Sequence, residues 1–158
     1  MQPGDVIEST GCHGVGVSKF SDRLKDYVGE LWWLSLAPQI RQQSFDSSKF
    51  FNFLFDQAKQ RKAYDVPQAV MSAVDVLDSL PLDRQGLSYN HEDFNRFFCS
   101  ELVATGLEKA GAVDSINASE VTPIELCRWN IYADNYYQLK GESSKRISRF
   151  NTASPLLV

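Results

Sequence analysis

The chain has 158 residues, of which 43% are hydrophobic and 12% aromatic, and a formal net charge of −4. This length and composition are typical of one globular domain with a sizeable core. The slight negative charge argues against nucleic acid or an anionic membrane as a partner. No apolar run is long enough to span a bilayer, and no basic-then-apolar signal peptide is visible. We therefore expect a cytoplasmic or virion-associated protein without a transmembrane segment.

The three cysteines, Cys12, Cys99 and Cys127, are odd in number and widely scattered. No CxxC spacing is present, so the sequence signals neither a zinc site nor a disulfide framework. A reducing compartment fits such usage best. We expect no bound metal and no cofactor.

The first 36 residues favour β-structure. Residues 5–9 and 15–18 are strand candidates on either side of a turn at Gly11–Gly14. Residues 21–27 can form one or two helical turns, with Ser21 as the cap. Residues 30–36 carry the strongest strand pattern, and their mostly apolar content predicts a central strand covered on both faces.

The next part of the chain favours helices. A phenylalanine-rich helix is predicted over 44–62, with Asp46, Ser47 or Ser48 as its cap, packed deep against the sheet. A second helix is predicted over 67–80, because proline suits the first helical position.

Cys99 stands at the start of a predicted amphipathic helix that runs to Ala110, with Glu101, Glu108 and Lys109 on its wet face. A thiol in a first helical turn lies near unpaired backbone N–H groups and the positive end of the helix dipole. Both favour thiolate, the nucleophilic form. The alternative is a buried structural cysteine, since free cysteine is among the most buried residue types.

The remaining chain is predicted to hold a polar loop over 112–122, a short helix and a last strand. Thr122 followed by Pro123 has the form of a helix start, and the strand covers 131–139. From Gly141 the chain turns polar and basic. We expect an α+β domain over residues 1–140 and a mobile C-terminal tail, or an arm that docks on a protein partner, over 141–158.

A thiolate nucleophile needs a base, usually a histidine, and a group that orients the base. His13 lies in the turn after the first strand and comes from a distant segment, as such sites require. His91 lies eight positions before Cys99 and is awkwardly placed as its base. Either residue is also readily explained as an ordinary exposed histidine.

Three other polar residues are site candidates. Glu8 sits in an otherwise apolar strand and is a candidate to orient an imidazole. The Tyr64 hydroxyl is a candidate donor to an oxyanion, with a simple loop anchor as the alternative. Glu101 is two residues past Cys99 and does not share its helix face, so we expect it to cap or anchor a neighbouring segment.

Several segments, taken in order, are similar to motifs of one enzyme family. They are Val6–Thr10, Trp32–Leu36, Lys62–Asp65, Arg96–Ala104 and Asn117–Leu126. Together they resemble the circularly permuted NlpC-type, papain-like cysteine hydrolases of the YiiX/YebB-like group, which are related to lecithin–retinol acyltransferase. The resemblance spans roughly residues 5–132 and implies bacterial or phage origin.

The resemblance implies a permuted papain-like core, in which a cysteine-bearing helix packs on a small antiparallel sheet with additional helices. It implies Cys99 as the nucleophile and Glu8 as the polar residue on the strand that follows the family's histidine strand. No histidine precedes Glu8 here. Three alternatives follow: His13 is the base and Glu8 loses its role, the chain is a shortened form that lacks the base, or the domain is a non-catalytic copy.

Two functions follow as expectations. The first is a thiol hydrolase or acyltransferase that acts on amide or ester bonds of cell-wall peptides or lipid-linked acyl groups. The second is a degenerate papain-like domain that serves binding or assembly in a phage particle or a cell-envelope complex. The aromatic segment 132–137 and the basic tail favour the second.

Overall fold

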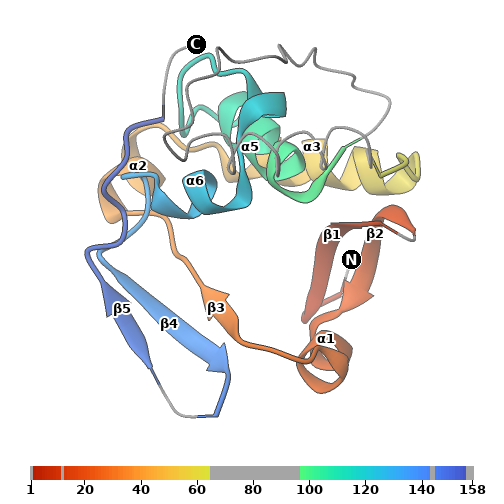
Figure 1. The fold of residues 1–158 in the computed structure, drawn as a ribbon. Coiled ribbons are helices and arrows are strands. Elements are labelled where there is room, and N and C mark those ends of the chain that lie inside the picture. The colour runs from red at the N-terminus through yellow and green to blue at the C-terminus, as the bar shows by residue number, and fades with distance from the viewer. Residues whose placement is uncertain (1, 12, 65–96, 143–144, 156–158) are drawn as a thin grey trace, which may run out of the picture.

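The computed structural model describes residues 2–11, 13–64, 97–142 and 145–155. It is a mixed α+β structure, as predicted, with a layer of helices above two separate antiparallel sheets (Figure 1). One sheet is the hairpin β1–β2 and the other has the order β3–β4–β5. The cysteine-bearing helix α5 packs against β1 of the smaller sheet.

The hairpin consists of β1 (Asp5–Thr10) and β2 (Gly14–Lys19). Both predicted strands and the turn between them are confirmed. Gly14 has a φ of +67°, a left-handed conformation that glycine adopts without strain. Helix α1 (Phe20–Asp26) follows at once, so the predicted cap Ser21 lies inside the helix instead.

Helix α2 (Pro38–Gln43) leads to the phenylalanine-rich helix α3 (Ser47–Lys59). Asp46 is the cap of α3, because its carboxylate accepts hydrogen bonds from the backbone N–H groups of Ser48 and Lys49, each at 3.0 Å. Helix α3 packs on α5 and on both hairpin strands. The helix predicted over 67–80 lies outside the described residues.

Helix α5 (Cys99–Lys109) confirms the predicted helix and its start. A 3₁₀ turn, η1 (Ala118–Glu120), then lies within the predicted loop, and α6 (Pro123–Arg128) follows. The predicted start of α6 is also confirmed: Thr122 and Glu125 form a capping box, with the Thr122 backbone N–H donating to the Glu125 carboxylate at 2.9 Å.

The second sheet contains β3 (Leu31–Trp33), β4 (Asn135–Lys140) and β5 (Arg146–Ser148). The prediction of a long central strand over 30–36 is wrong, because β3 is short, lies at the edge of this sheet and leaves Trp33 53% exposed. Residues 146–148, which we expected in a mobile tail, pair with β4. Ala153 also exchanges backbone hydrogen bonds with Arg128 and Asn130.

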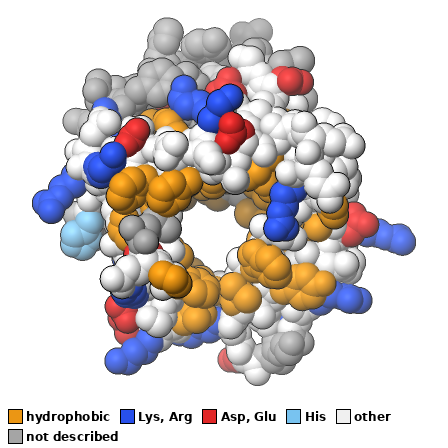
Figure 2. Space-filling view, turned by 180° about the vertical axis from the view of Figure 1, so that it is seen from behind, with side chains coloured by type: hydrophobic (Ala, Val, Ile, Leu, Met, Phe, Trp, Pro, Cys, Tyr) orange, Lys and Arg blue, Asp and Glu red, His pale blue; other side chains and the backbone are white. Residues whose placement is uncertain are grey.

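The core has two parts. The larger lies between α5, η1, α6 and β4, and the smaller joins the hairpin to α3 and α5 through Val15, Ala58, Phe97 and Leu102. Seen from behind, hydrophobic side chains rim an opening through the described part of the molecule (Figure 2). Apolar side chains exposed by 40% or more include those of Val17, Trp33, Tyr137 and Leu139.

Candidate functional site

Cys99 is the first residue of α5, and its side chain is exposed. The chain just before it is firmly held. The Phe97 N–H donates to the Ala63 carbonyl at 3.0 Å, and the Phe97 carbonyl accepts the buried Ser9 hydroxyl at 2.7 Å. The thiol therefore lies at a fixed helix start that is accessible to a reaction partner.

Tyr64 lies beside Cys99, because the Phe97–Ala63 hydrogen bond sets the two segments next to each other. The tyrosine side chain is partly buried and lies close enough to Cys99 for the thiol to act on the pKa of its hydroxyl. Burial is the largest cause that raises the pKa of Tyr64, and the neighbouring Cys99 raises it further. The hydroxyl is thus a protonated donor next to the sulfur.

Cys127, on α6, is the second thiol in this region. It is only partly exposed, and its pKa is raised by burial and then by the charge of Cys99. Its backbone carbonyl accepts the Tyr136 hydroxyl at 2.5 Å. A raised pKa leaves little thiolate at neutral pH, so Cys127 is an internal reference for the reactivity of Cys99.

Glu8 lies on β1 opposite Gly16, where its carboxylate accepts hydrogen bonds from Arg23 and Ser18. The Arg23 Nε–Glu8 Oε1 distance is 2.8 Å, and the guanidinium also forms an ion pair with the same oxygen. Among the described residues, this pairing occupies Glu8 and no hydrogen bond joins it to a histidine.

His13 is exposed in the hairpin turn, where its backbone N–H donates to the Thr10 carbonyl at 3.2 Å. Among the described residues, no side-chain hydrogen bond connects His13 with Cys99. His91 lies outside the described residues. The structure thus brings together Cys99 and Tyr64, and it places Glu8 with Arg23.

Glu101 is 2% exposed, so the prediction that it lies on the wet face of the helix is wrong. Its carboxylate accepts the Phe98 backbone N–H at 3.3 Å and so caps the N-terminus of α5. This contact is the capping role expected from its position. Glu108 is partly exposed and Lys109 exposed, as predicted.

Two serines that hold the segments around Cys99 in place were not among the predicted site residues. Ser9 connects β1 to the backbone before Cys99, and Ser100 donates to the Val121 carbonyl at 2.7 Å, which connects α5 to the segment before α6. Both are at most 9% exposed. Ser100 follows the cysteine directly, which was a usable signal, but nothing in the sequence around Ser9 indicates its distant partner.

Among the residues that the structure describes, no three histidine, cysteine, aspartate or glutamate side chains gather where they could hold a metal ion. None of the described helices has the length and hydrophobicity needed to cross a membrane.

The described residues define a mixed α+β protein with an accessible thiol at a helix start and a tyrosine hydroxyl beside it. Comparison with known proteins finds no matching family model, no matching curated protein and no matching solved structure.

Proposed function

We propose that the protein is a thiol hydrolase or acyltransferase in which Cys99 attacks the carbonyl of an amide or ester, of the cell-wall peptide or lipid-linked acyl class. The observation that carries this proposal is the pair formed by the exposed Cys99 thiol at the start of α5 and the Tyr64 hydroxyl beside it. The permuted papain-like motifs of the sequence support the same chemistry.

In this reaction the Cys99 sulfur forms a bond to the carbonyl carbon, and the carbon–nitrogen or carbon–oxygen bond of the substrate breaks. A histidine takes the thiol proton and passes it to the leaving amine or alcohol. Water, or an acceptor alcohol or amine, then cleaves the thioester and restores the thiol. Tyr64 and the backbone N–H groups at the start of α5 donate to the oxyanion.

The second candidate function is binding or assembly by a papain-like domain without catalysis. The apolar side chains on the second sheet favour it, because Trp33 is 53% exposed and forms an aromatic pair with Tyr137 at 5.9 Å between ring centroids. The pairing of Glu8 with Arg23 also favours it, since the carboxylate expected to orient a base already has a partner.

The first test is alkylation with iodoacetamide near pH 7, read at each cysteine by mass spectrometry. A nucleophilic Cys99 reacts faster than free cysteine, whereas the partly buried Cys127 reacts more slowly. Cys99 reacting no faster than free cysteine contradicts the proposal and favours the binding function.

The second test follows the hydrolysis of p-nitrophenyl acetate and of a panel of acyl amides. We expect Cys99→Ala to abolish the turnover that Cys127→Ala retains. An acyl group trapped on Cys99 and released by hydroxylamine identifies the thioester. Comparison of His13→Ala with His91→Ala then assigns the base. If Cys99→Ala retains the activity, the thiol mechanism is wrong.

A further inference from the structure

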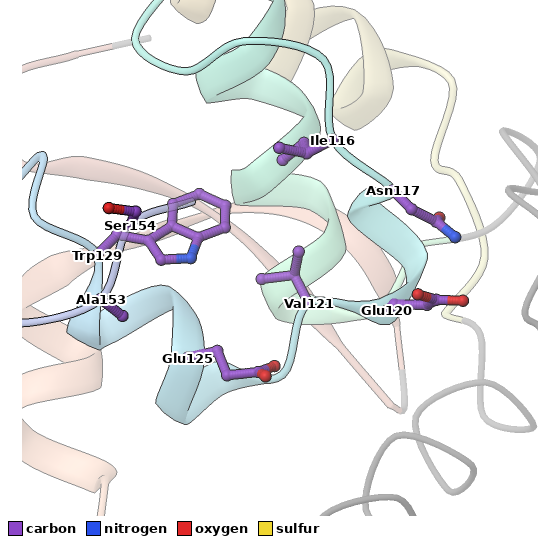
Figure 3. A pocket seen from close by; sticks show the side chains of 8 residues that line it. All are labelled: Ile116, Asn117, Glu120, Val121, Glu125, Trp129, Ala153 and Ser154. Atoms are coloured by element: carbon purple, nitrogen blue, oxygen red, sulfur yellow. The ribbon is translucent and has the colours of Figure 1, made fainter. Parts of the chain in front are cut away.

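A cavity of about 220 Å³ lies between η1, α6 and the C-terminal segment, on residues that the proposed thiol chemistry does not use. Ile116 and Val121 form an apolar middle part. Figure 3 shows Asn117 and Glu120 at one end, and Trp129 with Ala153 and Ser154 at the other. A volume near 220 Å³ equals roughly seven water molecules, so the cavity suits a small molecule or the end of a chain.

The Trp129 indole is the most informative group in the wall. The residue is 4% exposed, yet its indole N–H makes no hydrogen bond to any described residue. The indole nitrogen is not fully enclosed by the protein, so a molecule in the cavity can reach it. Figure 3 shows it on the side of the ring toward Val121 and Glu125, which is the side of the cavity. An accessible indole N–H without a protein partner can therefore donate to an acceptor atom of a ligand in the cavity.

Two carboxylates in the cavity wall, those of Glu120 and Glu125, can accept hydrogen bonds from a ligand. Glu120 has no hydrogen-bond or ion-pair partner among the described residues, and one Glu125 oxygen is occupied by Thr122 while the other has no described partner. Among the described residues that line the cavity, none is a lysine or an arginine. The wall therefore favours a cationic group at the carboxylates.

We propose that this cavity binds a primary ammonium group that has a neutral carbonyl next to it and a small apolar side chain. The ammonium lies beside Glu125, in the negative potential to which Glu120 adds from the same wall, the carbonyl accepts the Trp129 indole N–H, and the apolar part packs on Ile116 and Val121. Amino-acid amides and peptide N-termini both have this chemistry. The site is separate from Cys99 and does not depend on the proposed hydrolase activity.

The test is a titration of the full chain with L-leucinamide, followed by the indole N–H resonance of Trp129 in ¹H–¹⁵N NMR spectra. We expect a saturable shift of this resonance with leucinamide. N-acetyl-leucinamide, which has no ammonium, gives no saturable shift, and leucine binds more weakly because its carboxylate faces Glu120 and Glu125. A Trp129 resonance that leucinamide leaves unchanged, or equal binding of the acetylated probe, overturns the proposal.

Glu120→Gln is the main variant, because the Glu120 carboxylate has no hydrogen-bond or ion-pair partner among the described residues. We expect it to weaken leucinamide binding roughly two- to fivefold, as for the loss of a partly exposed charge pair. The matched control is Glu142→Gln, which removes the same charge from another hollow and leaves the affinity unchanged. Equal effects of the two variants contradict the assignment of the ammonium site.

A tripeptide, Leu-Gly-Gly-amide, distinguishes the two sources of the ligand chemistry. Binding at least as tight as that of leucinamide assigns the cavity to a peptide N-terminus. Weaker binding of the tripeptide assigns it to a free amino-acid amide.

Discussion

At the scale of single residues, the pair Cys99–Tyr64 is the most specific chemical feature of the described structure. Tyr64 reaches the sulfur because Ala63 accepts a hydrogen bond from Phe97, two positions before Cys99. The tyrosine stays protonated because burial, and then Cys99, raise its pKa. A hydroxyl held in this state donates to a developing oxyanion without first losing its proton.

This coupling predicts that Cys99→Ala lowers the pKa of Tyr64, because the substitution removes the neighbouring thiol, whose negative charge raises that pKa. Burial, the largest cause, remains, so the pKa stays above the ordinary value of 10.0. The measurement is a pH titration of the ¹³Cζ resonance of Tyr64. Cys127→Ala is the control and leaves this titration unchanged.

The oxyanion role of Tyr64 predicts that Tyr64→Phe lowers kcat by about 10²-fold on a substrate that the wild-type protein hydrolyses. KM changes little, because the hydroxyl acts mainly on the developing negative charge. Tyr27→Phe, at a tyrosine that is 50% exposed, serves as the control. An unchanged kcat in Tyr64→Phe assigns the residue to the loop-anchor role instead.

At the scale of elements, the hairpin turn determines how closely β2 approaches the segment that carries Tyr64. The Val15 N–H donates to the Lys62 carbonyl at 2.8 Å. A Cβ atom on Gly14 would lie 2.1 Å from the Lys62 carbonyl oxygen, and φ there is +67°. Only glycine therefore permits this contact between the hairpin and residues 62–64.

We expect Gly14→Ala to lower the free energy of unfolding by more than about 1 kcal/mol, because both the backbone conformation and the space oppose a side chain. The matched control is Gly16→Ala, since a Cβ atom on Gly16 meets nothing within 4 Å. Urea denaturation measures both. Similar stabilities of the two variants would show that residues 62–64 move away from the hairpin at little cost.

At the scale of the whole molecule, one thiol and two tyrosine hydroxyls in and beside the larger core make the free energy of unfolding depend on pH in the alkaline range. Burial is the largest cause of the raised pKa values of Cys127, Tyr132 and Tyr136, and it raises that of Tyr136 to about 12. Tyr136 is 3% exposed and packs edge-on against Tyr132 and Phe150. The folded state therefore prefers the protonated forms.

A pKa that is higher in the folded state than in the unfolded state gives stability that is complete below the unfolded value and is lost as the pH rises through the folded value. We therefore expect the free energy of unfolding to fall from about pH 9–10, the ordinary thiol and phenol values, through about pH 12 for Tyr136. Urea denaturation between pH 8 and roughly 11 measures the slope.

Tyr136→Phe should make this decline shallower, and the exposed Tyr137→Phe should leave it unchanged. The substitution also removes the hydrogen bond to the Cys127 carbonyl, so the variant starts from a lower stability at neutral pH. An equal slope in both variants would mean that Tyr136 does not carry the alkaline transition.

The sequence by itself determined the elements whose signals are local. The starts of α5 and α6, the Asp46 cap and the β1–β2 turn depend on residues within about four positions of one another. The capping role expected of Glu101 is equally local, since its partner Phe98 is three residues away. Such contacts are readable because the helix or turn alone brings the groups together.

Only the tertiary structure decided which distant groups meet. Glu8 binds Arg23, Ser9 binds the backbone before Cys99, Tyr64 lies beside the thiol, and Trp129 faces a cavity that the C-terminal segment helps to line. The strand pattern over 30–36 misled for the same reason, because whether an apolar strand is covered depends on its neighbours and not on its own residues. These contacts arise from packing between segments far apart in the chain, which no local pattern specifies.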